Sequence, residues 1–132
     1  MSAVQSISAR ELHSVDLKQA LVVDVRSPME YSEKRLAMPT AFAPVTDLDP
    51  RDVALRSGVL ADTQLFTICR SGARAKSAAE KFFRAGYTNV RFIDGGIAAC
   101  EEAGFATVGE GLPKTGEASP SLDRQVRLAA GA

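Results

Sequence analysis

Short apolar runs alternate with amphipathic stretches along this chain. Residues 21–25, Leu-Val-Val-Asp-Val, form an apolar run with one interruption, which is typical of a strand buried on both faces. Residues 65–68 and 90–93 have the same character, and residues 4–7 are short enough for an edge strand. The pattern therefore predicts several short strands with helices between them.

The helix starts are marked by local sequence signals. Ser8 and Glu11 have the spacing of a capping box, and Ser27 and Glu30 repeat it, with Pro28 at the first helical position. Three further helices are predicted, each followed by a glycine that can take a left-handed conformation: the helix opened by Asp49-Pro50 before Gly58, residues 75–85 before Gly86, and residues 97–103 before Gly104.

Strands that alternate with helices favour one α/β domain, with a mostly parallel central sheet and helices on both faces. The length of 132 residues fits a single domain. We place this domain at residues 1–108. Residues 109–120 are rich in Gly and Pro and predict a linker, which leaves residues 121–132 as a tail.

Composition excludes several classes of function. Lys and Arg total 16 against 16 Asp and Glu, so a net charge of zero gives no general basis for binding nucleic acid. No apolar run reaches the length of about 18 residues that a membrane span needs. Two cysteines and His13 are too few for a disulfide scaffold or a structural zinc site. We expect a cytoplasmic, reducing location and no metal or organic cofactor.

Residues 69–74, Cys-Arg-Ser-Gly-Ala-Arg, carry the strongest chemical signal. Cys69 follows a buried strand, and Arg74 comes just before the clearest predicted helix. Ligands of open parallel sheets bind beyond the carboxyl ends of strands, and the N-terminus of a helix offers unpaired N–H groups and about half a positive charge. Arg70 and Arg74 add full charges, and Gly72 allows the backbone to curl inward.

These features favour a thiolate at Cys69, held in an anion-binding loop. The simpler alternative is a small buried hydrophobic residue, which is the commoner state of a single cysteine. That alternative does not explain two arginines and a glycine within five residues of the thiol.

Three motifs of the chain resemble those of the rhodanese family of sulfurtransferases. Residues 69–74 resemble the active-site loop of that family, and residues 24–31, Asp-Val-Arg-Ser-Pro-Met-Glu-Tyr, resemble its first signature. Residues 92–96, Phe-Ile-Asp-Gly-Gly, followed by Gly104, resemble its closing segment. The resemblance extends over residues 6–108.

This resemblance implies that Cys69 takes a sulfane sulfur from thiosulfate or a persulfide donor, carries it as a persulfide, and passes it to a thiol or cyanide. The backbone amides of the loop would hold the charged sulfur. The loop residues concerned are Arg70, Ser71, Gly72, Ala73 and Arg74. A charged loop in this family accompanies small anionic donors.

Two other functions remain open. One is a catalytically idle rhodanese module for protein interaction or sulfur sensing, although such a module has no need of the intact loop. The weaker one is a phosphatase or arsenate reductase relative. Those phosphatases have five residues between the cysteine and the arginine, whereas four separate Cys69 from Arg74 here.

The chain departs from the family pattern at two places. Residues 34–39, Lys-Arg-Leu-Ala-Met-Pro, stand where a Gly-His-Ile type sequence is usual, and Cys100 stands where a tryptophan is common. Cys100 is expected to be a buried filler, because a resolving role would require it to approach Cys69. His13 is expected to be solvated or to cap a helix rather than to act as a base.

We expect Asp24, Arg26 and Glu30 to form a charge and capping network beneath the rim of the site. The tail, residues 121–132, resembles the segment that leads into transmembrane helices in membrane-anchored rhodaneses. Its Arg124 and Arg127 would then lie on the cytoplasmic side of a membrane, tethered by sequence beyond residue 132. The alternative is a frayed tail or a short amphipathic helix packed on the domain.

Overall fold

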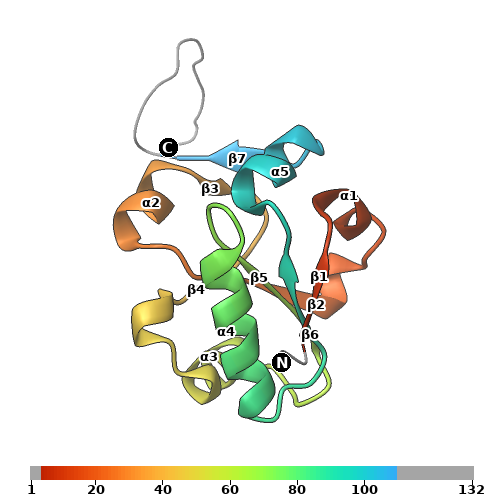
Figure 1. The fold of residues 1–132 in the computed structure, drawn as a ribbon, viewed down its shortest axis with the longest axis vertical. Helices are drawn as coiled ribbons and strands as arrows, with labels where there is room; N and C mark the ends of the chain where they lie inside the picture. The colour runs from red at the N-terminus through yellow and green to blue at the C-terminus, as the bar shows by residue number, and fades with distance from the viewer. Residues whose placement is uncertain (1–3, 110–132) are drawn as a thin grey trace.

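A computed structural model describes residues 4–109 (Figure 1). Its centre is a five-stranded sheet in which every pair is parallel, with the order β1-β6-β5-β2-β4. These strands are β1 (Gln5–Ile7), β6 (Val90–Ile93), β5 (Gln64–Ile68), β2 (Ala20–Asp24) and β4 (Ala41–Phe42). A separate antiparallel pair is formed by β3 (Arg35–Leu36) and β7 (Thr107–Val108).

Helices cover both faces of the sheet, as the sequence predicts. The helices are α1 (Ala9–Leu12), α2 (Pro28–Glu33), α3 (Pro50–Ser57), α4 (Ala73–Arg84) and α5 (Gly96–Glu102), with short 3-10 turns η1 (Leu17–Gln19) and η2 (Val45–Asp47). Alternate strand residues divide the core: Val23 packs with α3 and α4, whereas its neighbour Val22 packs with α1 and α5. Phe82 of α4 and Leu12 of α1 are fully buried on the two sides.

The local signals in the sequence are confirmed. Both capping boxes form at the starts of α1 and α2, and Gly58 after α3 adopts a φ of 69°. Strands β1, β2, β5 and β6 lie within a residue of the predicted runs. The two-residue strands β3, β4 and β7 were not predicted, because two residues carry no periodic pattern.

Helix α4 differs from the prediction, because it begins at Ala73 rather than at residue 75. Arg74 therefore belongs to the first turn of the helix instead of preceding it. The apolar periodicity starts only at Ala75, so it does not indicate the first turn of the helix. That turn is held by contacts of its residues with Glu30 and Cys69, which are described with the site below.

All five strands of the sheet are parallel, so their carboxyl ends lie at one edge. The segments that follow β2, β5 and β6 therefore gather there, next to α2 and the β3–β7 pair (Figure 1). Within residues 4–109 no helix is long and apolar enough to cross a membrane. Most of the predicted linker, and all of the predicted tail at 121–132, lie outside the described residues.

Candidate active site

The sulfur of Cys69 lies at the start of α4 and accepts hydrogen bonds from two backbone amides. The N–H of Gly72 donates to Sγ at 2.9 Å, and the N–H of Ala75 donates to it at 3.3 Å. Gly72 adopts a φ of 118°, which a residue with a side chain rarely takes. Turning the amides toward the sulfur therefore depends on glycine at this position.

The sulfur takes the place of a helix cap. Gly72 is the N-cap residue of α4 and has no side chain to accept from the first-turn amides. Those amides would otherwise lack a partner, and the Cys69 sulfur accepts from one of them. Partial positive charge at the helix start therefore faces the Cys69 sulfur.

The Cys69 side chain is also completely enclosed. The residue is 0% exposed and belongs to the apolar cluster that contains Ala75, Ala78 and Phe82. Behind it, the hydroxyl of Thr67 donates to the carbonyl of Ala75 at 2.7 Å. A reacting molecule can therefore reach the sulfur only if the loop or a neighbouring side chain moves.

Arg74 is held by an acidic residue from α2. Its guanidinium donates to both carboxylate oxygens of Glu30, at 2.8 and 3.0 Å. This pairing is the main reason why the pKa of Glu30 falls from 4.5 to about 2. Burial opposes the fall by raising the pKa, and hydrogen bonds from Ser27 lower it further. The same hydrogen bonds raise the pKa of Arg74. Arg74 is thus occupied within the protein and ties α2 to the loop.

Asp24 and Arg26 form a second ion pair, which is buried. Their side chains meet at 2.8 Å and are 1% and 4% exposed. Arg26 also donates to the carbonyl of Lys34 at 2.6 Å, which fixes the segment after α2. The structure therefore places the three predicted residues in two separate pairs: Asp24 with Arg26, and Glu30 with Arg74 of the loop. Among the described residues no side-chain hydrogen bond or ion pair joins the two pairs.

Arg70 has a different environment. Its side chain is exposed, and within residues 4–109 it has no hydrogen bond or ion pair. It lies on a cleft of about 320 Å³. The other residues that line this cleft are Arg26, Glu30, Glu33, Lys34, Ile97, Ala98 and Glu101. Ser71 and Ala73 are also exposed beside Arg70, so the outer surface of the loop faces solvent.

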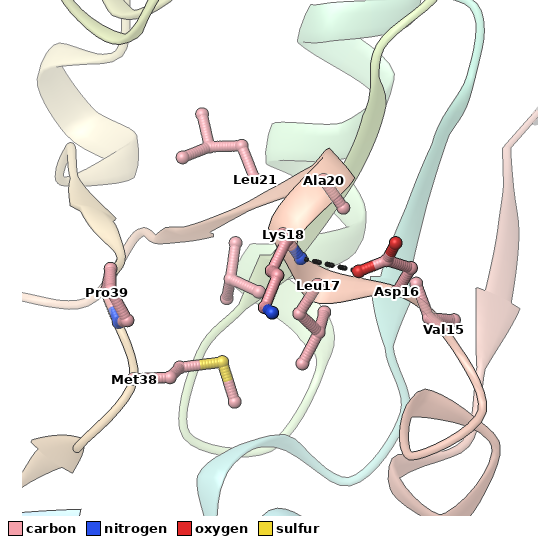
Figure 2. Close-up of a pocket in the computed structure, with 9 residues that line it drawn as sticks. Val15, Asp16, Leu17, Lys18, Ala20, Leu21, Met38 and Pro39 are labelled. Atoms are coloured by element: carbon pink, nitrogen blue, oxygen red, sulfur yellow. Dashed lines mark hydrogen bonds between the residues drawn. The ribbon is translucent and has the colours of Figure 1, made fainter.

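A larger apolar cavity of about 630 Å³ lies elsewhere, where η1 and the start of β2 face Met38 and Pro39 (Figure 2). The backbone N–H of Lys18 donates to Asp16 at its rim. None of the predicted site residues lines this cavity. Its lining holds no cysteine and no residue of the Cys69 loop, whereas Arg70 of that loop lines the smaller cleft.

Cys100 and His13 have structural surroundings. Cys100 packs on the opposite face of the sheet from Cys69, and burial raises the pKa of its thiol to about 11. The His13 ring bonds the carbonyl of Ala103 at 2.6 Å and stacks on Phe105. Among the described residues no group of three or more His, Cys, Asp or Glu side chains could hold a metal.

Cys69 thus lies at the carboxyl edge of a parallel sheet and accepts hydrogen bonds from two backbone amides at the start of α4, which is the arrangement of an α/β domain with a cysteine loop. The family model for the rhodanese-like domain matches residues 8–103 of this chain. The chain belongs to this family.

Two curated relatives and one solved structure are similar to this chain over most of its length. Thiosulfate sulfurtransferase GlpE of Pseudomonas entomophila is 32% identical over 99 residues, which cover 74% of this chain and 84% of GlpE. The protein slr1261 of Synechocystis is 29% identical over 127 residues, and the match spans 96% of this chain and 65% of slr1261. A rhodanese-related protein of Thermoplasma volcanium superposes with a TM-score of 0.61 at 28% identity, covering 80% of this chain and 99% of that one.

Proposed function

We propose that this protein is a sulfurtransferase that moves a sulfane sulfur from thiosulfate, or a similar anionic donor, to a thiol or cyanide through a persulfide on Cys69. The observation that carries the proposal is the pair of amides, from Gly72 and Ala75, that donate to the Cys69 sulfur. A persulfide anion formed there would meet the same partial positive charge. The similarity to GlpE supports the same class of reaction.

The reaction consists of two displacements on sulfur. The Cys69 thiolate attacks the outer sulfur of thiosulfate, a new S–S bond forms, and the old S–S bond breaks with its electron pair leaving on sulfite. Cyanide or a thiolate then attacks the outer sulfur of the persulfide. The Cys69 thiolate leaves, and thiocyanate or an acceptor persulfide is released, so no external oxidant or reductant is consumed.

Arg70 is the residue we assign to the donor. Its exposed guanidinium lines the cleft and has no partner within the described residues, so it can meet an incoming anion without breaking an existing contact. Arg74 would act differently, because its bidentate bond to Glu30 fixes the loop. Entry of the donor must also uncover the sulfur, and Arg70 is adjacent to it.

The test is release of thiocyanate from thiosulfate and cyanide. We expect the wild-type protein to turn over and Cys69→Ser to be inactive, because serine is a far poorer nucleophile toward sulfur. Cys100→Ser is the matched control, since it changes the other thiol on the far face of the sheet. Equal activity in wild type and Cys69→Ser would refute the proposal.

One observation favours a second candidate function, a rhodanese-like module that does not transfer sulfur. Cys69 is entirely enclosed and packs with apolar residues of the core. In that case the loop would serve a partner protein rather than a small donor. No thiocyanate from a folded wild-type protein, together with no added mass on Cys69 after exposure to thiosulfate, would support this second candidate.

A further inference from the structure

The start of α5 lies directly against the backbone of the Cys69 loop. The N–H of Ile97 donates to the carbonyl of Cys69 at 3.0 Å. Ile97 is the second residue of α5, where a backbone N–H has no partner inside its own helix. The Cys69 loop is therefore held in part by a hydrogen bond from α5, which lies outside the loop's own segment of the chain.

Gly96 makes this approach possible. A Cβ atom placed on Gly96 would overlap the carbonyl oxygens of Cys69 and Arg70. It would lie 2.4 and 2.2 Å from them, and real Cβ atoms essentially never approach another atom that closely. Both obstacles are backbone atoms, which cannot rotate aside as a side chain can. A side chain at position 96 would thus push the carbonyl groups of Cys69 and Arg70 away from α5.

The orientation of the Cys69–Arg70 peptide determines whether the amides that follow it point toward the Cys69 sulfur. With the Cys69 carbonyl fixed on Ile97, the following residues curl so that the amides of Gly72 and Ala75 face Sγ. Gly72 itself lies close to the same turn, because a Cβ on it would be 3.8 Å from the backbone N of Gly95. Loop and turn are packed backbone against backbone.

We propose that Gly96 is a positioning residue for Cys69, acting through the Cys69–Arg70 peptide to keep the loop amides aimed at the sulfur. Gly96 would hold the hydrogen bonds to the Cys69 sulfur whether or not the protein transfers sulfur; only the purpose of these bonds rests on the proposed function. Gly96→Ala should shift the peptide and weaken at least one N–H···S bond. Alkylation of Cys69 at pH 6, relative to pH 10, should then slow several-fold, up to about tenfold, which is the size of effect expected from losing one charge-assisted hydrogen bond.

The chain offers a matched control for this substitution. Gly58 has a φ of 69°, close to the 65° of Gly96, but a Cβ on Gly58 would meet nothing within 4 Å. Gly58→Ala therefore carries the same backbone strain without the overlap. Comparing the two alanine variants separates the effect of close approach from the effect of left-handed backbone.

The experiment measures alkylation of Cys69 by iodoacetamide at pH 6 and pH 10, resolved by peptide mass. The ratio of the two rates reports ionisation, because a change in access alters both rates alike. We expect the rate at pH 6 divided by the rate at pH 10 to fall several-fold, up to about tenfold, in Gly96→Ala. The same ratio should stay unchanged in Gly58→Ala. An unchanged ratio in folded Gly96→Ala would overturn the proposal.

If Gly96→Ala does not fold, the wild-type protein supplies a second test. Amide hydrogen exchange at Ile97 should be strongly slowed, although a position in the first turn of a helix is ordinarily unprotected. Fast exchange at Ile97 would overturn the proposal. Wild-type protein that releases no thiocyanate, together with a lowered ratio in Gly96→Ala, would instead refute the proposed function and leave the positioning role intact.

Discussion

The ion pair between Glu30 and Arg74 gives a prediction whose size and pH dependence follow from the structure. Glu30→Gln removes the charge but keeps a side chain that can still accept and donate at the start of α2, where Gln also serves in a capping box. The substitution therefore isolates the contact between α2 and the Cys69 loop from the capping of α2 itself.

The magnitude can be bounded from the pKa of Glu30. A fall from 4.5 to about 2 corresponds to an upper bound of about 3.4 kcal/mol in the free energy of unfolding. The Glu30 side chain is 26% exposed and that of Arg74 is 37% exposed, so solvent screens part of this energy. We expect Glu30→Gln to lower the free energy of unfolding by about 1–2 kcal/mol at pH 7.

The loss should depend on pH in a defined direction. A carboxyl whose pKa is lowered in the folded state stabilises the fold above its ordinary pKa, and this contribution disappears as pH falls toward the folded value. The difference between wild type and Glu30→Gln should therefore be constant above about pH 5 and shrink between pH 4.5 and 2. At pH 3.5 it should be smaller by roughly a half or more.

The assay is urea denaturation of both proteins at pH 7 and pH 3.5. Glu33→Gln is the matched control on the same helix, because Glu33 is exposed and its carboxylate has no hydrogen bond or ion pair within residues 4–109. That control should change the free energy of unfolding by less than about 0.5 kcal/mol. A loss in Glu30→Gln that is the same at both pH values would refute the electrostatic explanation.

Two other substitutions and one alkylation measurement test residues near the site and on the far face of the sheet. Asp24→Asn should lower the free energy of unfolding by about 3–5 kcal/mol in urea titrations, because it leaves the buried charge of Arg26 unpaired; a loss below 1 kcal/mol would contradict this. His13→Ala should cost about 1–2 kcal/mol through the lost bond to Ala103, with no change in the alkylation of Cys69; altered alkylation would contradict a purely structural role. In the folded protein at pH 8, Cys100 should be alkylated at least about 100-fold more slowly than in urea, because burial holds its thiol neutral; equal rates would contradict that burial.

Signals that depend on nearby residues could be predicted from the sequence. The capping boxes at Ser8 and Ser27 each involve residues three positions apart, and both form as expected. The run at 90–93 matches β6 because strand propensity and burial agree there. The motif at residues 69–74 could be recognised from the sequence because its residues are contiguous, and its role as an active-site loop stays a prediction.

Contacts between distant segments could not be predicted. Glu30 was expected to join a charge network, but its partner Arg74 lies 44 residues away, and no local pattern indicates that pair. The first turn of α4 was missed because a thiol, rather than a usual capping residue, accepts from its amide. The glycines at 95 and 96 marked a tight turn in the sequence, whereas the overlap that excludes a side chain at 96 depends on tertiary packing.

The proposed reaction requires the Cys69 sulfur to be a nucleophile held by backbone amides. Mass spectrometry of the peptide that contains Cys69, after incubation of the folded protein with thiosulfate, tests it most directly. We predict a gain of about 32 Da, one sulfur atom, that dithiothreitol removes and that Cys100 does not acquire. Recovery of this peptide with unchanged mass, from protein whose Cys69 is still alkylated by iodoacetamide, would contradict the account.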